Sequence, residues 1–473
     1  MKKRFFFLTL FCFSIFTLLG CDKFLEIPPP RTQLITNTVF ENDALANSAV
    51  IAIYSKLINE SGISYRIPMQ TGLSGDELTN YSKNIDVIQV YQNAISPLNA
   101  RTASVWEPLY RYVFQCNEVI EKVENSDRLN SKLRYHLVGE AKFLRAFIYF
   151  YLKNMWGEIP LILKTDYKIS ANAERTGVAE IDSQIVRDLK DAISLLPDNF
   201  IGSDGIVKSF DRLRASKWAA MALLSRVSLY RKDYKSAVKY ADSVIANANV
   251  FYLEQDLNKV FLKTSPEAIF QLQPVATFLV TPEGSNFILR GTPSTSEANS
   301  TVVSSALLRV FEKDDKRALS WINSIKVGTN TYFFPFKYKV RTTGGGAASE
   351  EYSVVLRLAE LYLIRAEAYA QIGEIGLANE DLRVVRKRAG LSYDLTADKD
   401  SLLGKIIHER QVEFFCEWGH RWFDLKRLSI LDSVMTNTVP LKSAQWDSRH
   451  AFFPIPQKDR NNNPNLTQNP GYN

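Results

Sequence analysis

Residues 356–390 read LRLAELYLIRAEAYAQIGEIGLANEDLRVVRKRAG, and the fold class can be inferred from this segment first. Apolar residues recur every three or four positions, which is the spacing of one face of an α-helix. A glycine interrupts the pattern, and small residues stand where two antiparallel helices would touch. The segment therefore predicts a helical hairpin similar to a tetratricopeptide unit, with the key positions at Ala366, Tyr369, Gly373, Ala378 and Leu382.

A second hairpin of the same kind is predicted within residues 215–247. Its key positions are Leu224, Ser225, Asp233, Tyr234, Ala237 and Ala241. Such a hairpin buries its remaining apolar face only by stacking on neighbours, so we expect about four hairpins in all. Helical spacing also recurs at roughly 41–60, 105–125, 131–156, 181–198 and 401–418. The protein is predicted to be mainly α.

Three zones lack this spacing and are rich in turn-forming residues: 61–100, 248–350 and 440–473. The middle zone contains a short β-like run at 331–340. We expect a single body over residues 41–473, with tetratricopeptide-like helices at about 41–247 and 355–425. The irregular zones, with a few short strands, would pack on one side of this scaffold and form a shallow binding face.

The first twenty residues have the features of a secretory signal, namely a basic start, an apolar run and small residues. The run from Phe5 to Leu19 is short for a membrane span. Leu18-Leu19-Gly20-Cys21 is typical of a bacterial lipobox, so Cys21 is the predicted lipidation site and 21–40 a proline-rich linker. Cleavage would leave 55 of the 58 basic residues against 51 acidic ones, an excess too small to indicate nucleic-acid binding.

The mature chain would keep two unmodified cysteines, Cys116 and Cys416. Both lie in apolar helical patterns and are expected to be small core residues, although a disulfide between them stays open as an alternative. The four histidines show no His-Glu-x-x-His spacing, so no metal site is predicted. The triple glycine at 344–346 lacks the Lys-Ser/Thr of a phosphate loop, and no cofactor is expected.

Glu409, Glu413 and Glu417 recur every four residues, which would place them on one exposed helix face with Arg410 and Arg421 nearby. Paired carboxylates can hydrolyse glycosides, but they must face each other across a sugar-sized cleft. Structural ion pairing on a solvated helix face is the preferred interpretation. No catalytic residue is predicted.

Several motifs follow one another in order along almost the whole chain: CDKFL at 21–25, CNEVI at 116–120, GEAKFLRA at 139–146, NMWGEIP at 154–160, LRLAELYLIRAEA at 356–368, EWGHRWFD at 417–424 and the ending from Pro454 to Tyr472. Together they resemble the SusD/RagB family of nutrient-binding outer-membrane lipoproteins. In one place the chain departs from the family pattern, because Trp418 stands between the glutamate and the glycine. We expect a local change of packing there.

The resemblance implies a non-enzymatic protein that captures glycan for nutrient uptake and polysaccharide utilisation. It would be lipid-anchored on the outer membrane, facing the cell exterior, and would deliver oligosaccharide to a SusC-like TonB-dependent barrel. The short sequence after Cys21 lacks an acidic run, so the periplasmic face stays open. Three alternatives remain: a RagB-like peptide carrier, a lipid-anchored glycoside hydrolase, and an assembly protein that holds a partner peptide.

Ligand contacts are not fixed by the family motifs and are predicted from chemistry. Tyrosine and tryptophan faces stack on sugar rings, while acidic and amide side chains pair with hydroxyls. Aromatic residues of the irregular zones also include Tyr65 and Phe334. The predicted ligand-binding residues are Asp76, Glu77, Asn80, Tyr81, Tyr91, Trp321, Tyr332 and Trp446.

Overall fold

The computed structural model describes residues 39–274, 280–342 and 349–472. The predicted signal peptide, the lipidation site Cys21 and most of the proline-rich linker lie outside the described residues. Within the described ranges, no helix combines the length and the apolar character that crossing a bilayer would require.

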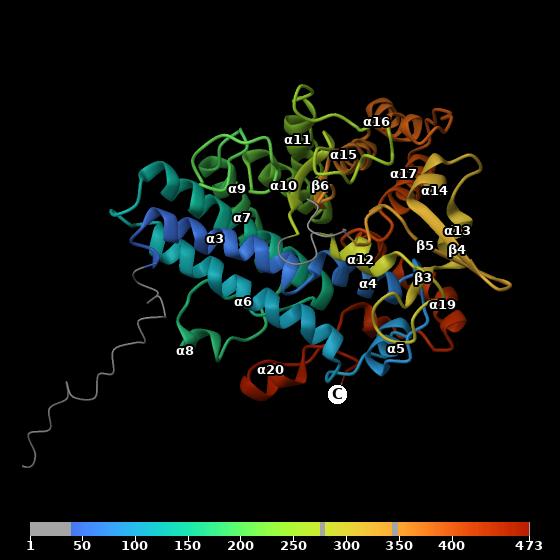
Figure 1. Cartoon of the computed structure of the whole chain (residues 1–473), viewed down its shortest axis with the longest axis horizontal. Coiled ribbons are helices and arrows are strands. Elements are labelled where there is room, and N and C mark those ends of the chain that lie inside the picture. The colour runs from blue at the N-terminus through green and yellow to red at the C-terminus, as the bar shows by residue number, and fades with distance from the viewer. Residues whose placement is uncertain (1–38, 275–279, 343–348, 473) are drawn as a thin grey trace, which may run out of the picture.

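Long helices form the first half of the protein (Figure 1). Helix α7 is the central one, because most of its side chains are buried and it packs against both α6 and α9. Asn99 and Asn130 cap α6 and α7, since each side-chain oxygen accepts two backbone N–H groups of the first turn. The long helices are α3 (Asp43–Asn59), α6 (Ala100–Val123), α7 (Ser131–Trp156) and α9 (Val178–Leu195), and the short α8 (Tyr167–Ser170) lies between α7 and α9 in the chain.

Both predicted hairpins are present, and the mainly α fold is confirmed. They consist of α10 (Lys217–Tyr230) with α11 (Tyr234–Ile245), and of α15 (Leu358–Ile372) with α16 (Ile375–Arg388). Ser225 Oγ donates to the Ala237 carbonyl at 2.8 Å, so small residues do bring the first pair of helices together. Gly373 ends α15 with φ +91°, a conformation that glycine adopts without steric cost.

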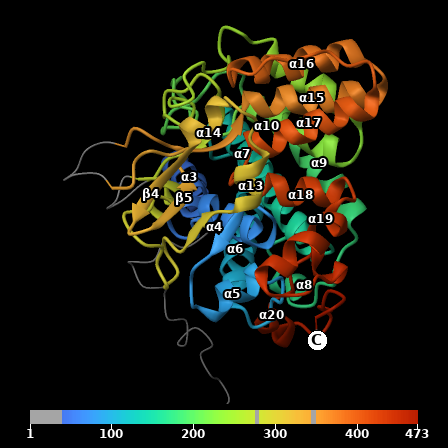
Figure 2. The ribbon, with the colours of Figure 1, turned by 90° about the vertical axis from the view of Figure 1, so that its right-hand side faces the viewer.

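The two hairpins stack although about a hundred residues separate them. Helix α11 packs on α15, and the Arg365 guanidinium links the hairpins by pairing with both Asp381, at 2.6 Å, and Asp242. The C-terminal helices α17 (Lys399–Glu413), α18 (His420–Arg427) and α19 (Leu431–Thr438) continue beside this stack (Figure 2).

The strands of the described residues form three antiparallel pairs. They are β1 (Leu78–Asn80) with β3 (Thr301–Val303), β2 (Ala268–Leu272) with β6 (Ser353–Arg357), and β4 (Ile322–Val327) with β5 (Asn330–Pro335). The β-like run expected at 331–340 is a strand only as far as Pro335. The β4–β5 hairpin lies at the edge of the molecule, far from α8 and α9 (Figure 1).

The zone 61–100 is more helical than its composition suggests, so the prediction of irregular structure there is wrong. Helix α4 (Ile63–Ser74) has every residue buried except Arg66, and α5 (Ile85–Tyr91) follows it. A helix that is buried all round shows no amphipathic spacing, and Pro68 inside α4 suggests a break. The other two zones also contain short helices: α12 (Pro282–Phe287), α13 (Ser305–Val310), α14 (Lys316–Trp321), the 3₁₀ helices η2 (Val439–Lys442) and η3 (Ser448–Ala451), and α20 (Gln457–Asn462).

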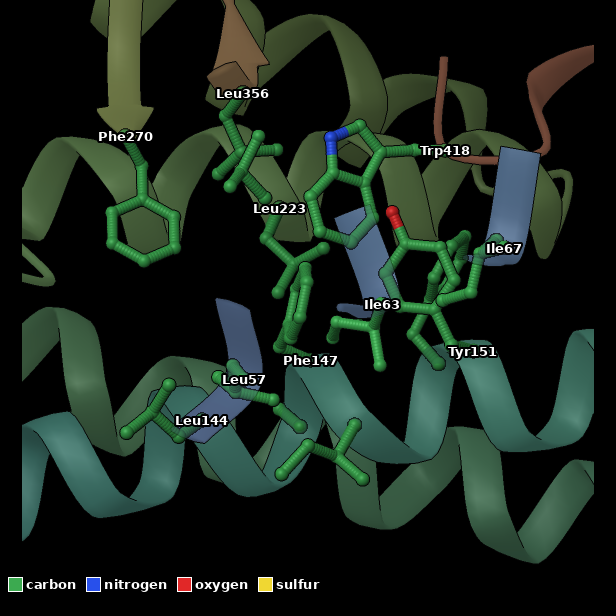
Figure 3. Close-up of a cluster of buried hydrophobic side chains, with 14 of the residues drawn as sticks. Leu57, Ile63, Ile67, Leu144, Phe147, Tyr151, Leu223, Phe270, Leu356 and Trp418 are labelled. Atoms are coloured by element: carbon green, nitrogen blue, oxygen red, sulfur yellow. The ribbon is translucent and has the colours of Figure 1, made fainter. Parts of the chain in front are cut away.

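The main core joins α3, α4, α7, α10 and the β2–β6 pair (Figure 3). Trp418, where the chain departs from the family pattern, lies inside this core. Its ring contacts Phe147 and Tyr151 at centroid distances of 5.6 and 5.4 Å, and its indole N–H donates to the Val354 carbonyl. Its backbone has φ +45°, so the extra residue turns the chain sharply before Gly419.

The three glutamates expected on a solvated helix face are buried, so that part of the prediction is wrong. Glu409 and Glu413 lie in α17, whereas Glu417 lies beyond its end. Arg410 and Arg421 are not their partners, because these side chains pair with Asp424 and Asp76. Structural ion pairing is confirmed, but in the core: the Glu413 cluster consists of Glu267, Arg317, Arg357, Arg388, Glu409, Glu413 and Glu417.

Glu413 is the centre of this cluster. Its carboxylate pairs with Arg357 Nη1 at 2.5 Å, with Arg317 Nη1 at 3.0 Å and with Arg388. Burial alone would raise the pKa of Glu413, but the three guanidiniums hold it well below its usual range. A sugar ring has no access to these carboxylates.

Candidate functional site

Two of the predicted ligand residues, Tyr81 and Tyr332, meet at the surface. Tyr81 follows β1, and its backbone N–H donates to the Ser300 carbonyl just before β3. Tyr332 lies in β5, which packs on β3. The two rings stand edge to face, with centroids 5.6 Å apart and an interplanar angle of 86°. Tyr81 is 40% exposed and Tyr332 is half-buried. We call this pair the tyrosine platform.

Asn80 and Tyr91 lie next to the platform, but both side chains are engaged within the protein. The Asn80 side chain accepts from the Ser82 backbone N–H and donates to its carbonyl, which closes a turn after β1. Tyr91 is half-buried on α5, and the Lys442 ammonium lies 5.0 Å from its ring centroid. These two residues shape the surroundings of the platform.

Asp76 and Glu77 point inward and not toward the surface. Asp76 forms a two-pronged ion pair with Arg421, in which Nη2 and Oδ2 are 2.6 Å apart. Glu77 accepts the Cys416 backbone N–H at 3.1 Å. Burial, together with the negative charge of Asp76, raises the pKa of Glu77 to about 8. Both residues therefore support the β1 region from within, and the expectation that they contact ligand does not match their orientation.

Neither predicted tryptophan joins the tyrosine platform. Trp321 is 0% exposed, and its indole N–H donates to the Leu257 carbonyl, so it belongs to the core. Trp446 is half-buried, packs edge to face on Trp422 and donates to Asp432. Both tryptophans lie in zones whose composition predicts irregular structure. Trp321 instead ends α14, a short helix that packs inward.

A cavity of about 280 Å³ lies behind the loop that precedes β3, and sequence reasoning missed it. It is lined by α4, α12, the start of α6 and the loop residues Glu297 and Ala298. Arg101 is its most buried charged residue, and we call it the Arg101 cavity. No sequence signal marks Arg101, which occupies the first turn of an ordinary capped helix.

A larger cavity, of about 490 Å³, lies between α3 and the 201–214 loop. Its buried polar groups bond to one another: the Tyr54 hydroxyl donates to Glu140, and Arg214 pairs with the same carboxylate and with Asn47. These bonds tie the loop to the helices, which is a structural role.

Metal and thiol chemistry are not indicated in the described ranges. No group of three metal-ligating side chains comes together there. Cys116 and Cys416 are both buried as free thiols, so the alternative of a disulfide between them is wrong. Burial raises the pKa of the Cys116 thiol to about 12, which keeps it protonated and unreactive.

Family comparisons agree with this architecture. Residues 23–229 match a family described as "Starch-binding associating with outer membrane", and residues 311–472 match the SusD family. The chain belongs to the SusD-like family. A SusD-like protein of Formosa agariphila, P25, is 24% identical over 97% of each chain.

Solved SusD-like structures share the fold. A SusD homologue from Bacteroides thetaiotaomicron superposes with a TM-score of 0.79 at 20% identity, covering 93% of this chain and 99% of that one. A protein described as a laminarin-binding SusD-like protein gives a TM-score of 0.76 at 22% identity over 90% and 99%. The chain therefore has the same arrangement of helices and strands as these two proteins.

Proposed function

We propose that this SusD-like chain binds oligosaccharide at the tyrosine platform and releases it chemically unchanged. The observation that carries the proposal is the edge-to-face pair of Tyr81 and Tyr332. Tyr81 offers an exposed ring whose orientation is fixed by its neighbour and by the backbone bond to Ser300. A ring held in place before binding loses little conformational freedom when a sugar stacks on it.

Tyrosine suits this ligand because its ring and its hydroxyl can act at the same time. The ring face stacks on the C–H face of a sugar, and the phenol can exchange hydrogen bonds with sugar hydroxyls. A shallow platform of this kind accepts the side of an extended chain and does not require its end. Polysaccharide fragments of varied length are therefore suitable ligands.

The comparisons support the ligand class. One matched family is described as starch-binding, and one superposed structure is described as binding laminarin. Both are glucans with flat ring faces. The proposal does not include hydrolysis, since Glu409, Glu413 and Glu417 are engaged in buried ion pairs.

Capture would take place on the outer membrane. The lipobox at Cys21 supports a lipid anchor, and the matched family is described as associating with that membrane. The protein would face the cell exterior and pass its cargo to a SusC-like TonB-dependent barrel. Protease treatment of intact cells tests the orientation, and co-purification from solubilised membranes tests the barrel partner.

The binding experiment is calorimetric titration of residues 22–473 with laminari-, malto- and other oligosaccharides and with peptides. Saturable binding of one glycan class is expected, and Tyr81→Ala should weaken it about tenfold, the order of one aromatic contact. Tyr167→Ala is the matched control, because Tyr167 is 72% exposed on the distant α8 and should leave affinity unchanged.

Each mixture is examined afterwards for shortened glycan. Turnover at enzymatic rates would replace the binding proposal with the glycoside hydrolase alternative. Peptide binding without glycan binding would favour the RagB-like alternative. Equal losses in Tyr81→Ala and Tyr167→Ala would show that the platform is not the site.

A further inference from the structure

Arg101 is buried without the hydrogen bonds that a buried guanidinium normally has. The residue is 5% exposed, and among the described residues neither Nε nor Nη2 finds a hydrogen-bond partner of good geometry. Nη2 lies against the carboxylate of Glu297, as an ion pair only. Buried N–H groups without hydrogen-bond acceptors are costly, so a ligand that supplies acceptors would stabilise this guanidinium.

The surroundings of Arg101 strengthen the positive potential of the cavity. Arg66 also lines it, and its positive charge adds to the effect of burial, which lowers the pKa of Arg101 to about 10. Both guanidiniums remain charged at neutral pH. The Tyr65 hydroxyl is buried without a hydrogen-bond partner among the described residues, and burial raises its pKa to about 12. It is therefore a neutral donor available to an anion.

The acidic residues at the cavity do not cancel this charge from within. Glu60 and Glu297 line the cavity, but both side chains are about half exposed, and Glu60 faces Arg111 at 3.6 Å. Water screens exposed carboxylates, whereas the guanidinium of Arg101 is shielded from water. Glu297 thus occupies the position that the anionic group of a ligand would take, and it can swing toward solvent.

The loop containing Glu297 also supports the tyrosine platform. It forms a wall of the Arg101 cavity, while its neighbours in the chain accept hydrogen bonds from the platform side: the Ser300 carbonyl from Tyr81 and the Thr295 carbonyl from Lys83. One loop therefore separates the two features, and a bound chain could contact both.

We propose that the Arg101 cavity is a subsite for an anionic group on the glycan, so that the protein selects acidic oligosaccharides. The inference rests on the proposed glycan-binding function and names the ligand class. A carboxylate or sulfate ester would displace Glu297, pair with Arg101 and Arg66, and accept a hydrogen bond from Tyr65. Carboxylates and sulfates both match the forked donors of a guanidinium.

The test compares three probes by calorimetry with residues 22–473: an oligogalacturonate, a sulfated carrageenan oligosaccharide and a neutral laminari-oligosaccharide. At least one acidic probe should bind more tightly than the neutral one. Arg101→Gln should weaken that probe at least tenfold and leave the neutral probe unchanged. Glu297→Gln should tighten it several-fold, because the competing carboxylate is removed. The probe that responds identifies carboxylate or sulfate as the recognised group.

Arg128→Gln is the matched control, since it removes the same charge from an exposed side chain paired with Glu41, outside the cavity lining. Arg66→Gln provides a second variant at a less buried position, so that poor folding of Arg101→Gln would not prevent the test.

Two kinds of failure can be told apart. If all glycans bind in a Tyr81-dependent way and neither arginine variant changes acidic binding, the subsite is overturned and the proposed function stands. If Arg128→Gln weakens acidic binding as much as Arg101→Gln, the effect is one of net charge and the subsite is likewise overturned. If no glycan binds, both proposals fail.

Discussion

Arg357 and Arg101 are both buried arginines, but the protein treats them in opposite ways. Every guanidinium nitrogen of Arg357 is bonded: Nε to Glu417 at 2.8 Å, Nη1 to Glu267 at 3.0 Å and to Glu413, and Nη2 to Glu417 at 2.9 Å. Arg101 has one carboxylate against Nη2 and no partner at Nε among the described residues. All hydrogen-bond donors of Arg357 are therefore used within the protein, whereas Arg101 keeps N–H donors that a ligand in the cavity could use.

The difference separates scaffold from site on physical grounds. A buried ion pair is maintained because removing one partner exposes the other to an uncompensated desolvation cost. Arg101 has part of that cost in the unliganded protein, because its Nε has no hydrogen-bond partner among the described residues, and a ligand can relieve it. The two environments therefore predict opposite responses to mutation.

The largest expected effect is that of Glu413→Gln. The amide would present N–H groups to Arg317, Arg357 and Arg388, which need an acceptor. The three guanidiniums would also lose the negative charge of Glu413 that they share. We expect the free energy of unfolding to fall by about 3–5 kcal/mol, measured by urea denaturation.

Glu380→Gln is the control for this prediction, because Glu380 pairs with Arg383 in an exposed position and should change stability by less than about 1 kcal/mol. A loss below about 1 kcal/mol for Glu413→Gln as well would mean that the buried network does not stabilise the fold.

A second, pH-dependent effect of similar size is expected at Glu77. Burial and then Asp76 raise its pKa from 4.5 to about 8, so the folded protein holds a proton that the unfolded chain releases. The stabilising contribution is complete below about pH 4.5 and is lost as the pH rises toward 8. Glu77→Gln keeps the shape of the side chain and removes this loss, so its stability relative to wild type should rise by up to about 1.4 kcal/mol per pH unit.

Urea denaturation at several pH values between about 5 and 8 measures that slope. Glu283, whose pKa burial raises to about 7, titrates in both proteins and cancels in the difference. Parallel pH profiles for the variant and the wild type would show that Glu77 is ionised in the folded protein.

Local patterns were sufficient to predict the scaffold. Gly373 and the small residues around it marked one hairpin, and Asp233 marked the turn of the other, because these features depend on a few neighbouring residues. Helix α4 was missed for the complementary reason: it is buried on every side, so no polar face reveals its period.

The site depends on contacts between distant parts of the chain. The chemistry of tyrosine singled out Tyr81 and Tyr332 separately, and about 250 residues lie between them in the chain. Their contact arises only because β1 pairs with β3 and β3 packs on β5. The partners of Glu413 are likewise remote, since Arg357 is 56 and Arg317 is 96 positions away. Helical spacing predicts which face of the helix carries Glu413. It does not predict which distant residues cover that face.

The smallest expected effect is the most discriminating one. Arg101→Gln should change the free energy of unfolding by less than about 1 kcal/mol, because the substitution removes a buried charge that the protein satisfies only in part. The variant loses the ion pair with Glu297 but also loses the cost of shielding the guanidinium from water. Urea denaturation beside Glu413→Gln measures both under the same conditions. If Arg101→Gln were as damaging as Glu413→Gln, Arg101 would be a structural residue, and its missing hydrogen bonds would not indicate a ligand.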